Sequence, residues 1–99
     1  MFARITRLET TPEQHEEGVR VVAEEVLPWV RENTGFRGLI GLAERERGTS
    51  LVLSFWADRE ALDLTEAAAD RLGGLTAAGV GAVHRGMEAY EVSLFEVER

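Results

Sequence analysis

The feature that most constrains this sequence is a nearly continuous apolar run in its middle. Residues 49–56 read Thr-Ser-Leu-Val-Leu-Ser-Phe-Trp, and their β-branched and aromatic content predicts a strand. Successive side chains of a strand point to opposite faces of its sheet, so neighbouring apolar residues predict burial on both faces. Any fold for this chain therefore has to cover both faces of the sheet at this strand.

Three further segments have strand character, and two have helical spacing. The apolar positions Val19, Val22, Val26 and Val30 recur every three or four residues, which is typical of a helix. The expected strands are residues 2–9, 36–45, 49–56 and 86–97, and the expected helices run from about residue 12 to 33 and from residue 58 to about 80.

The ends of the expected helices carry recognisable signals. Thr11-Pro12-Glu13-Gln14 matches a capping box with proline at the first helical position, and Asp58 is a suitable N-cap for the second helix. Gly35 predicts the end of the first helix. Pro28 removes the backbone hydrogen bond to Glu24, which predicts a bend in the first helix.

Glycines mark the remaining boundaries. In Glu46-Arg47-Gly48 we expect a hairpin turn in which Gly48 adopts a positive φ. Gly73-Gly74 is expected to weaken the second helix, and Gly79-Val80-Gly81 to end it.

The elements follow the order strand, helix, strand, strand, helix, strand. This order predicts one α+β domain over residues 1–99, ferredoxin-like (β-α-β-β-α-β), with a four-stranded antiparallel sheet. Two helices cover one face only, while the third and fourth strands carry apolar side chains on the other face as well. Because exposed apolar patches mark association surfaces, we expect a homodimer that pairs through the sheet face and closes into a barrel.

Composition narrows the chemistry. The chain has 99 residues, no cysteine and a net charge of −7, and all eleven of its basic residues are arginine. The absence of cysteine excludes disulfides and thiolate metal sites, and the absence of lysine excludes Schiff-base chemistry. The acidic balance argues against nucleic acid as a partner. With no apolar run long enough for a membrane span and no signal-peptide pattern, we expect a cytoplasmic protein without membrane contact.

Three short motifs carry a family resemblance. Thr34-Gly35-Phe36-Arg37-Gly38-Leu39 follows a helix with Leu27-Pro28-Trp29, and Ser54–Ala61 and Tyr90-Glu91-Val92 lie further along the chain. Together they resemble antibiotic biosynthesis monooxygenase (ABM)-type domains. The resemblance implies a dimeric α+β barrel with a pocket between helices and sheet in each subunit. Family members include cofactor-independent oxygenases of polyphenolic substrates and haem-degrading enzymes.

Two departures from the family pattern bear on cofactors. Haem-degrading members pair a tryptophan like Trp56 with a histidine about ten residues on, where this chain has Glu66, and with an asparagine in the first strand, which this chain lacks. The oxygenases carry an asparagine shortly before the tryptophan, where Val52 and Ser54 stand here, and this departure counts against the oxygenase and favours a binding protein of the same fold. The resemblance therefore argues against haem, and we expect no cofactor and no metal.

Five residues are candidates for a site. Trp56, with Phe36, is expected either to form the wall of a ligand pocket, stacking against a planar ligand, or to be buried in the hydrophobic core. Arg37 would neutralise a phenolate or carboxylate, or pair with a glutamate at the sheet edge. Tyr90 would donate a hydrogen bond to a ligand carbonyl, or pack at the rim. His84 would carry a proton, or lie exposed in a loop. His15, among glutamates in the first turn of a helix, is expected at the surface.

These residues leave the function open between classes. One hypothesis is a cofactor-independent monooxygenase acting on a small, planar, apolar or phenolic molecule, with Trp56 and His84 in the chemistry. The alternative is a non-catalytic small-molecule-binding or regulatory protein of the same fold, and a third is a dimerising domain without a pocket. The preference for the enzyme rests on the family resemblance.

Overall fold

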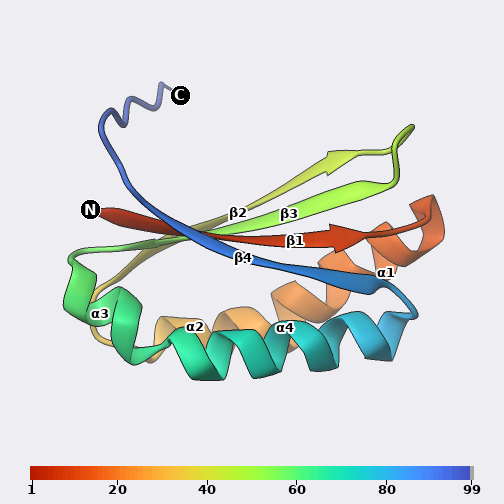
Figure 1. The fold of residues 1–99 in the computed structure, drawn as a ribbon, viewed down its shortest axis with the longest axis horizontal. Coiled ribbons are helices and arrows are strands. Elements are labelled where there is room, and N and C mark those ends of the chain that lie inside the picture. The colour runs from red at the N-terminus through yellow and green to blue at the C-terminus, as the bar shows by residue number, and fades with distance from the viewer. Residues whose placement is uncertain (99) are drawn as a thin grey trace.

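The chain forms a four-stranded antiparallel sheet with its helices on one face, in a computed structural model that describes residues 1–98 (Figure 1). The strands lie in the order β2-β3-β1-β4. They are β1 (Phe2–Glu9), β2 (Phe36–Glu44), β3 (Thr49–Trp56) and β4 (Val83–Glu91). The helices are α1 (Pro12–Val21), the π-helix η1 (Val22–Val26), α2 (Leu27–Arg31), α3 (Arg59–Leu64) and α4 (Glu66–Val80). The predicted ferredoxin-like β-α-β-β-α-β fold is confirmed.

The predicted helix starts are confirmed. Thr11 accepts a hydrogen bond from the backbone N–H of Gln14, whose side chain accepts one in return from the N–H of Thr11. Asp58 caps α3 by accepting from the N–H of Ala61 at 2.8 Å. Each cap satisfies backbone donors that the first turn of a helix leaves free.

Pro28 acts differently from the predicted bend. The turn before it widens into η1, in which the N–H of Leu27 bonds the carbonyl of Val22 five residues back. Proline has no N–H and crowds the preceding turn. A π-helical turn accommodates both constraints, so that the chain stays helical from α1 through α2.

The last strand lies earlier than predicted. The expected span was residues 86–97, whereas β4 is Val83–Glu91. Phe2, at the start of β1, already pairs with Glu91, and beyond that pair only the carbonyl of Met1 remains, which accepts the N–H of Val92 at 2.9 Å. The ladder also shifts register between Arg7 and Leu8, opposite Gly86, whose φ is +126°. The sequence pattern favoured a strand in residues 92–97, but a strand needs a neighbour to pair with.

The core lies between the helices and one end of β3. Trp56, Leu62, Val30 and Ala61 are buried there. Gly35 makes this packing possible, since a Cβ at that position would lie 2.6 Å from the Cβ of Ala61.

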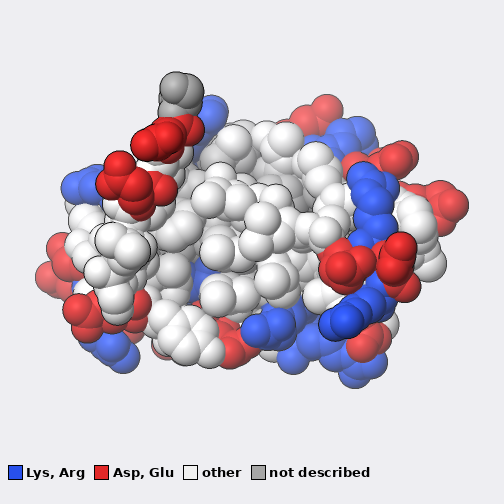
Figure 2. Space-filling view, turned by 90° about the horizontal axis from the view of Figure 1, so that it is seen from above, with Lys and Arg blue, Asp and Glu red and all other residues white. Residues whose placement is uncertain are grey.

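The face of the sheet away from the helices is apolar in its centre and charged at its rim (Figure 2). On this face β3, one of the two inner strands, contributes Leu51, Leu53 and Phe55, which are only partly buried. Phe95, from the segment after β4, packs edge-on against Phe55 at 5.6 Å between ring centroids. The predicted apolar outer face is therefore present and is only partly covered by the C-terminal segment.

No helix within residues 1–98 is long and apolar enough to cross a membrane. The same residues contain no group of three or more acidic or histidine side chains that could hold a metal ion.

Candidate functional site

A pocket lies between the helix layer and the sheet. Its narrower part, with a volume of about 70 Å³, is lined by side chains of β1, β2, β3, η1, α2 and α4. A wider part of about 180 Å³ extends along the sheet toward the β2–β3 hairpin. Leu8, Val22, Leu39, Val52 and Thr76 line both parts, so the two are adjacent. Most of the lining is apolar, which suits a small organic ligand.

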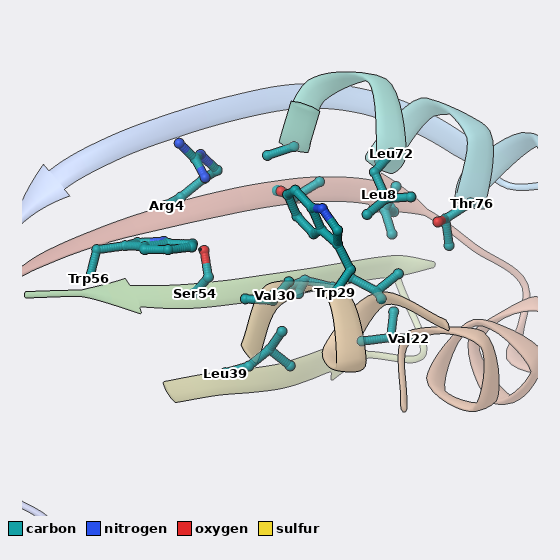
Figure 3. A pocket seen from close by; sticks show the side chains of 15 residues that line it. Arg4, Leu8, Val22, Trp29, Val30, Leu39, Ser54, Trp56, Leu72 and Thr76 are labelled. Atoms are coloured by element: carbon teal, nitrogen blue, oxygen red, sulfur yellow. Dashed lines mark hydrogen bonds between the residues drawn. The ribbon is translucent and has the colours of Figure 1, made fainter. Parts of the chain in front are cut away.

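Two tryptophans stand at the narrow part. The indole of Trp29 reaches in from α2, and Trp56 lies beside Ser54 at the end of β3 (Figure 3). Trp56 is 1% exposed and donates its Nε1–H to the Oγ of Ser54 at 2.9 Å. The ring of Phe36 packs edge-on against Trp56. These contacts fix the Trp56 ring as one wall of the pocket.

Arg4 is a cation within this apolar wall. It projects from β1 toward the helices, is 4% exposed, and holds its guanidinium 5.8 Å from the centre of the Trp56 ring. Nη1 donates to the hydroxyl of Thr65 at 3.1 Å, and Nη2 donates to the carbonyl of Leu62 at 2.5 Å. These partners orient the guanidinium, yet neither carries a negative charge.

The break between α3 and α4 creates the partners of Arg4. Thr65 stands at this break, where its N–H bonds Leu62 in a tight turn. The carbonyl of Leu62 also accepts the hydroxyl of Thr65 at 3.0 Å, in addition to Nη2 of Arg4. Both acceptors of Arg4 therefore belong to the turn that joins α3 to α4.

The charge of Arg4 is not neutralised within the part of the chain that the structure describes. Arg7, Arg20, Arg45, Arg59 and Arg85 form ion pairs with carboxylates, and among the described arginines that form none, Arg4 is the buried one. Burial lowers the pKa of Arg4, and the more distant charges of Glu66 and Asp63 raise it. An arginine nevertheless stays protonated near neutral pH. A buried cation is costly without an anion, so this end of the pocket favours a ligand with an anionic oxygen.

Of the residues that the sequence suggested, the structure brings Trp56 and Phe36 together. Arg37 does not join them: it is exposed, and its Nη1 donates to the carbonyl of Phe36 at 3.3 Å. Tyr90 lies on the opposite face of the sheet, because it pairs with Ala3, whose neighbour Arg4 points to the helices. Arg37 and Tyr90 therefore do not line this pocket, and their roles in ligand binding stay predictions.

His84 lies in β4, not in the loop where it was expected, and it does not line the pocket. Its ring packs behind Gly73 and Thr6, which do line it; a Cβ on Gly73 would lie 3.3 Å from Nε2 of His84. This Nε2 is buried without a hydrogen-bond partner among residues 1–98. A catalytic role for His84, as for Trp56, stays a prediction.

Sequence reasoning missed Arg4, Trp29 and His15 as pocket residues. Arg4 had a signal: it shares the alternating positions of Phe2, Thr6 and Leu8, so an inward-facing charge could be read from the strand period. His15 lines the wider part of the pocket and is half-buried, which corrects its expected place at the surface.

Known proteins resemble this chain in structure but not in sequence. No family model matches the sequence, and no curated protein is significantly similar to it. Solved structures match it along nearly its whole length. A dimeric ferredoxin-like protein from an uncultured marine organism is 14% identical, with a TM-score of 0.71 over 96% of this chain and 97% of that one.

Two further matches are oxygenases of Streptomyces. A variant of SnoaB, a cofactor-independent oxygenase from S. nogalater, is 16% identical with a TM-score of 0.67 over 98% of both chains. The ActVA-Orf6 monooxygenase of S. coelicolor, in complex with nanaomycin D, is 16% identical with a TM-score of 0.64 over 97% of this chain and 92% of that one. A protein of unknown function from Nitrosomonas europaea also matches.

The chain therefore has the fold of antibiotic biosynthesis monooxygenase and dimeric ferredoxin-like structures, as the sequence resemblance predicted. Identities this low show a shared fold and leave the activity to be argued from the pocket.

Proposed function

We propose that this protein is a cofactor-independent oxygenase of a small, planar, phenolic or otherwise acidic molecule. The observation that carries the proposal is the buried, unpaired Arg4 beside Trp56 in an otherwise apolar pocket. A guanidinium in such surroundings stabilises an anion more strongly than it would in water.

The chemistry needs an anionic substrate and dioxygen. The substrate loses a proton from an acidic carbon or hydroxyl, and the resulting anion transfers one electron to O₂. The substrate radical and superoxide then form a carbon–oxygen bond, and the resulting peroxide anion takes up a proton to give a hydroperoxide. Loss of water leaves a carbonyl, so that a CH₂ group and O₂ give C=O and H₂O. Arg4 holds the negative charge, while Trp29 and Trp56 shape the pocket and exclude water.

The fold shared with SnoaB and ActVA-Orf6 supports this reaction class. The second candidate is a binding or regulatory protein that takes the same ligand without turnover. One observation favours it: among the described residues, the narrow part of the pocket is lined by no carboxylate and no imidazole that could accept a proton.

Oxygen consumption distinguishes the oxygenase from the binding or regulatory protein. With an anthrone- or quinol-type substrate we expect uptake of one O₂ per product carbonyl, and at least about a tenfold lower kcat/KM in Arg4→Met. Arg37→Met, which removes an exposed arginine outside the pocket, is the matched control. Binding of the substrate without oxygen uptake assigns the second candidate instead.

We also propose that the protein is a homodimer joined through the outer face of its sheet, and that it is cytoplasmic. The apolar centre of that face supports the dimer, since a single chain leaves Ile40, Leu42 and Tyr90 40%, 47% and 51% exposed.

A further inference from the structure

A second polar cluster lies at the far end of the pocket, near the β2–β3 hairpin. The hydroxyl of Ser50 lies 2.8 Å from Nδ1 of His15 and 2.8 Å from the hydroxyl of Thr10. Ser50 is 6% exposed, and all three residues line the wider part of the pocket. Two segments that are distant in sequence, residues 10–15 and the start of β3, thus place a threonine, a histidine and a serine around one point.

This cluster has bonding capacity to spare. A serine hydroxyl offers one donor and two acceptor positions, and His15 and Thr10 occupy two of these three. The imidazole can accept or donate at Nδ1 depending on its tautomer, so the remaining position on Ser50 can be either an acceptor or a donor. A neutral hydroxyl or carbonyl group on a ligand fits either state.

The two polar ends are separated along one strand. Ser50 and Ser54 lie on the same face of β3, and Ser54 pairs with Arg4 across the ladder to β1. Four strand residues span about 13 Å. Between the ends the pocket is lined by apolar residues, Val22, Leu39 and Val52 among them. The length is that of two or three fused or linked aromatic rings.

We propose that Ser50, held by His15 and Thr10, is a second anchor that binds a neutral hydroxyl or carbonyl at the end of the ligand opposite its anionic group. The ligand class is therefore an elongated, planar acid with a polar group at each end. This inference rests on the pocket and on Arg4 as the anion site of the proposed function, and it does not depend on oxygenation.

Two acids that differ by one hydroxyl test the inference. 4-Biphenylcarboxylate and 4′-hydroxybiphenyl-4-carboxylate share the acid and the ring system, and only the second carries a hydroxyl at the far end. By titration calorimetry at neutral pH, we expect the hydroxylated acid to bind the unaltered protein about 3- to 10-fold more tightly. In Ser50→Ala the two dissociation constants are expected to become equal.

Ser93→Ala is the control, because it removes a serine hydroxyl that is exposed and lines neither part of the pocket. It is expected to keep the preference for the hydroxylated acid. Since the preference is also measured in the unaltered protein, the test does not depend on the folding of Ser50→Ala.

The outcomes separate the two proposals. Equal affinities in the unaltered protein, or a preference that survives in Ser50→Ala, overturn the second anchor and leave the Arg4 site standing. Failure of both acids to bind overturns the anchor together with the Arg4 site. Binding with the expected preference but without oxygen uptake supports the anchor and removes only the oxygenase.

Discussion

At the scale of single residues, the ability of the pocket to bind an anion depends on which N–H donors of Arg4 are already used in hydrogen bonds. Two of its N–H groups bind neutral oxygens of the break between α3 and α4, and the guanidinium keeps donors and a full charge for a ligand. A salt bridge at this place would hold the side chain equally well but would leave nothing for an anion. The absence of a carboxylate partner among residues 1–98 is thus the feature that makes the pocket a candidate site.

The outer sheet face carries a contrasting cluster, in which Arg7, Glu88 and Tyr90 are linked. Glu88 accepts hydrogen bonds from Tyr90 and Arg7, and these lower the pKa of Glu88 below its usual value of 4.5. The carboxylate therefore stabilises the folded state above about pH 4.5, and this contribution is lost as the pH falls through the lowered pKa.

Replacing Glu88 tests this linkage. Glu88→Gln is expected to reduce the loss of stability between pH 5 and pH 3, measured as the urea midpoint across that range. Glu46→Gln, in the hairpin turn, changes the net charge by the same amount and is the control. An acid dependence of Glu88→Gln as steep as that of the unaltered protein would contradict the role of the cluster.

The candidate residues show where sequence reasoning succeeds at this scale. Trp56 could be placed at the buried end of an apolar strand, although the strand period did not decide which face of the sheet it lies on, because both faces of that strand are apolar. Tyr90 could not, since its face follows from pairing with Ala3, which only the completed sheet defines. The partners of Arg4 are 58 and 61 residues away in sequence, so its burial could not be derived from local pattern.

At the scale of elements, the helices are shaped by what they pack against. The glycines at 73 and 74 were expected to weaken the second helix, yet α4 runs through both. Gly73 lets Thr6 and His84 approach the helix closely, whereas a Cβ at Gly74 would meet nothing within 4 Å. The packing of α4 therefore requires a residue without a side chain at Gly73 but not at Gly74.

Substituting alanine at each position tests whether the two glycines differ in this way. Gly74→Ala is expected to raise the free energy of unfolding by about 0.5–1 kcal/mol, because alanine loses less backbone entropy in a helix. Gly73→Ala is expected to be less stable than Gly74→Ala, since its Cβ would press on His84. Urea denaturation of both variants measures the difference. Equal stabilisation by the two substitutions would show that close approach to β4 does not constrain α4.

Element boundaries followed the sequence where a local signal existed. The caps at Thr11 and Asp58 and the positive φ of Gly48, at +69°, match their predictions. The end of β4 and the π-turn before Pro28 do not, because one depends on the length of β1 and the other on how a proline is absorbed within a packed helix.

At the scale of the whole molecule, one face of the sheet is covered by helices and the other is not. The bare face has an apolar centre and a charged rim, which is the arrangement of an interface core within a polar surround (Figure 2). A second copy of the chain would complete the burial that the apolar run of β3 requires.

Sedimentation velocity at micromolar concentration is expected to show a dimer. Leu53→Glu, which places a charge in the middle of the outer face, is expected to give a monomer. Leu64→Glu makes the same exchange at a site that is 78% exposed at the end of α3, and is expected to leave the dimer intact. A monomeric unaltered protein, or a dimer that tolerates Leu53→Glu, would rule out this interface.

The measurement that most directly tests the anion site compares 2-naphthoate with 2-naphthamide, which share their rings and differ in charge. By titration calorimetry we expect the unaltered protein and Arg37→Met to bind naphthoate at least about tenfold more tightly than naphthamide. In Arg4→Met the preference is expected to disappear. Equal affinities in the unaltered protein, or a preference that persists in Arg4→Met, would contradict an anion site at Arg4.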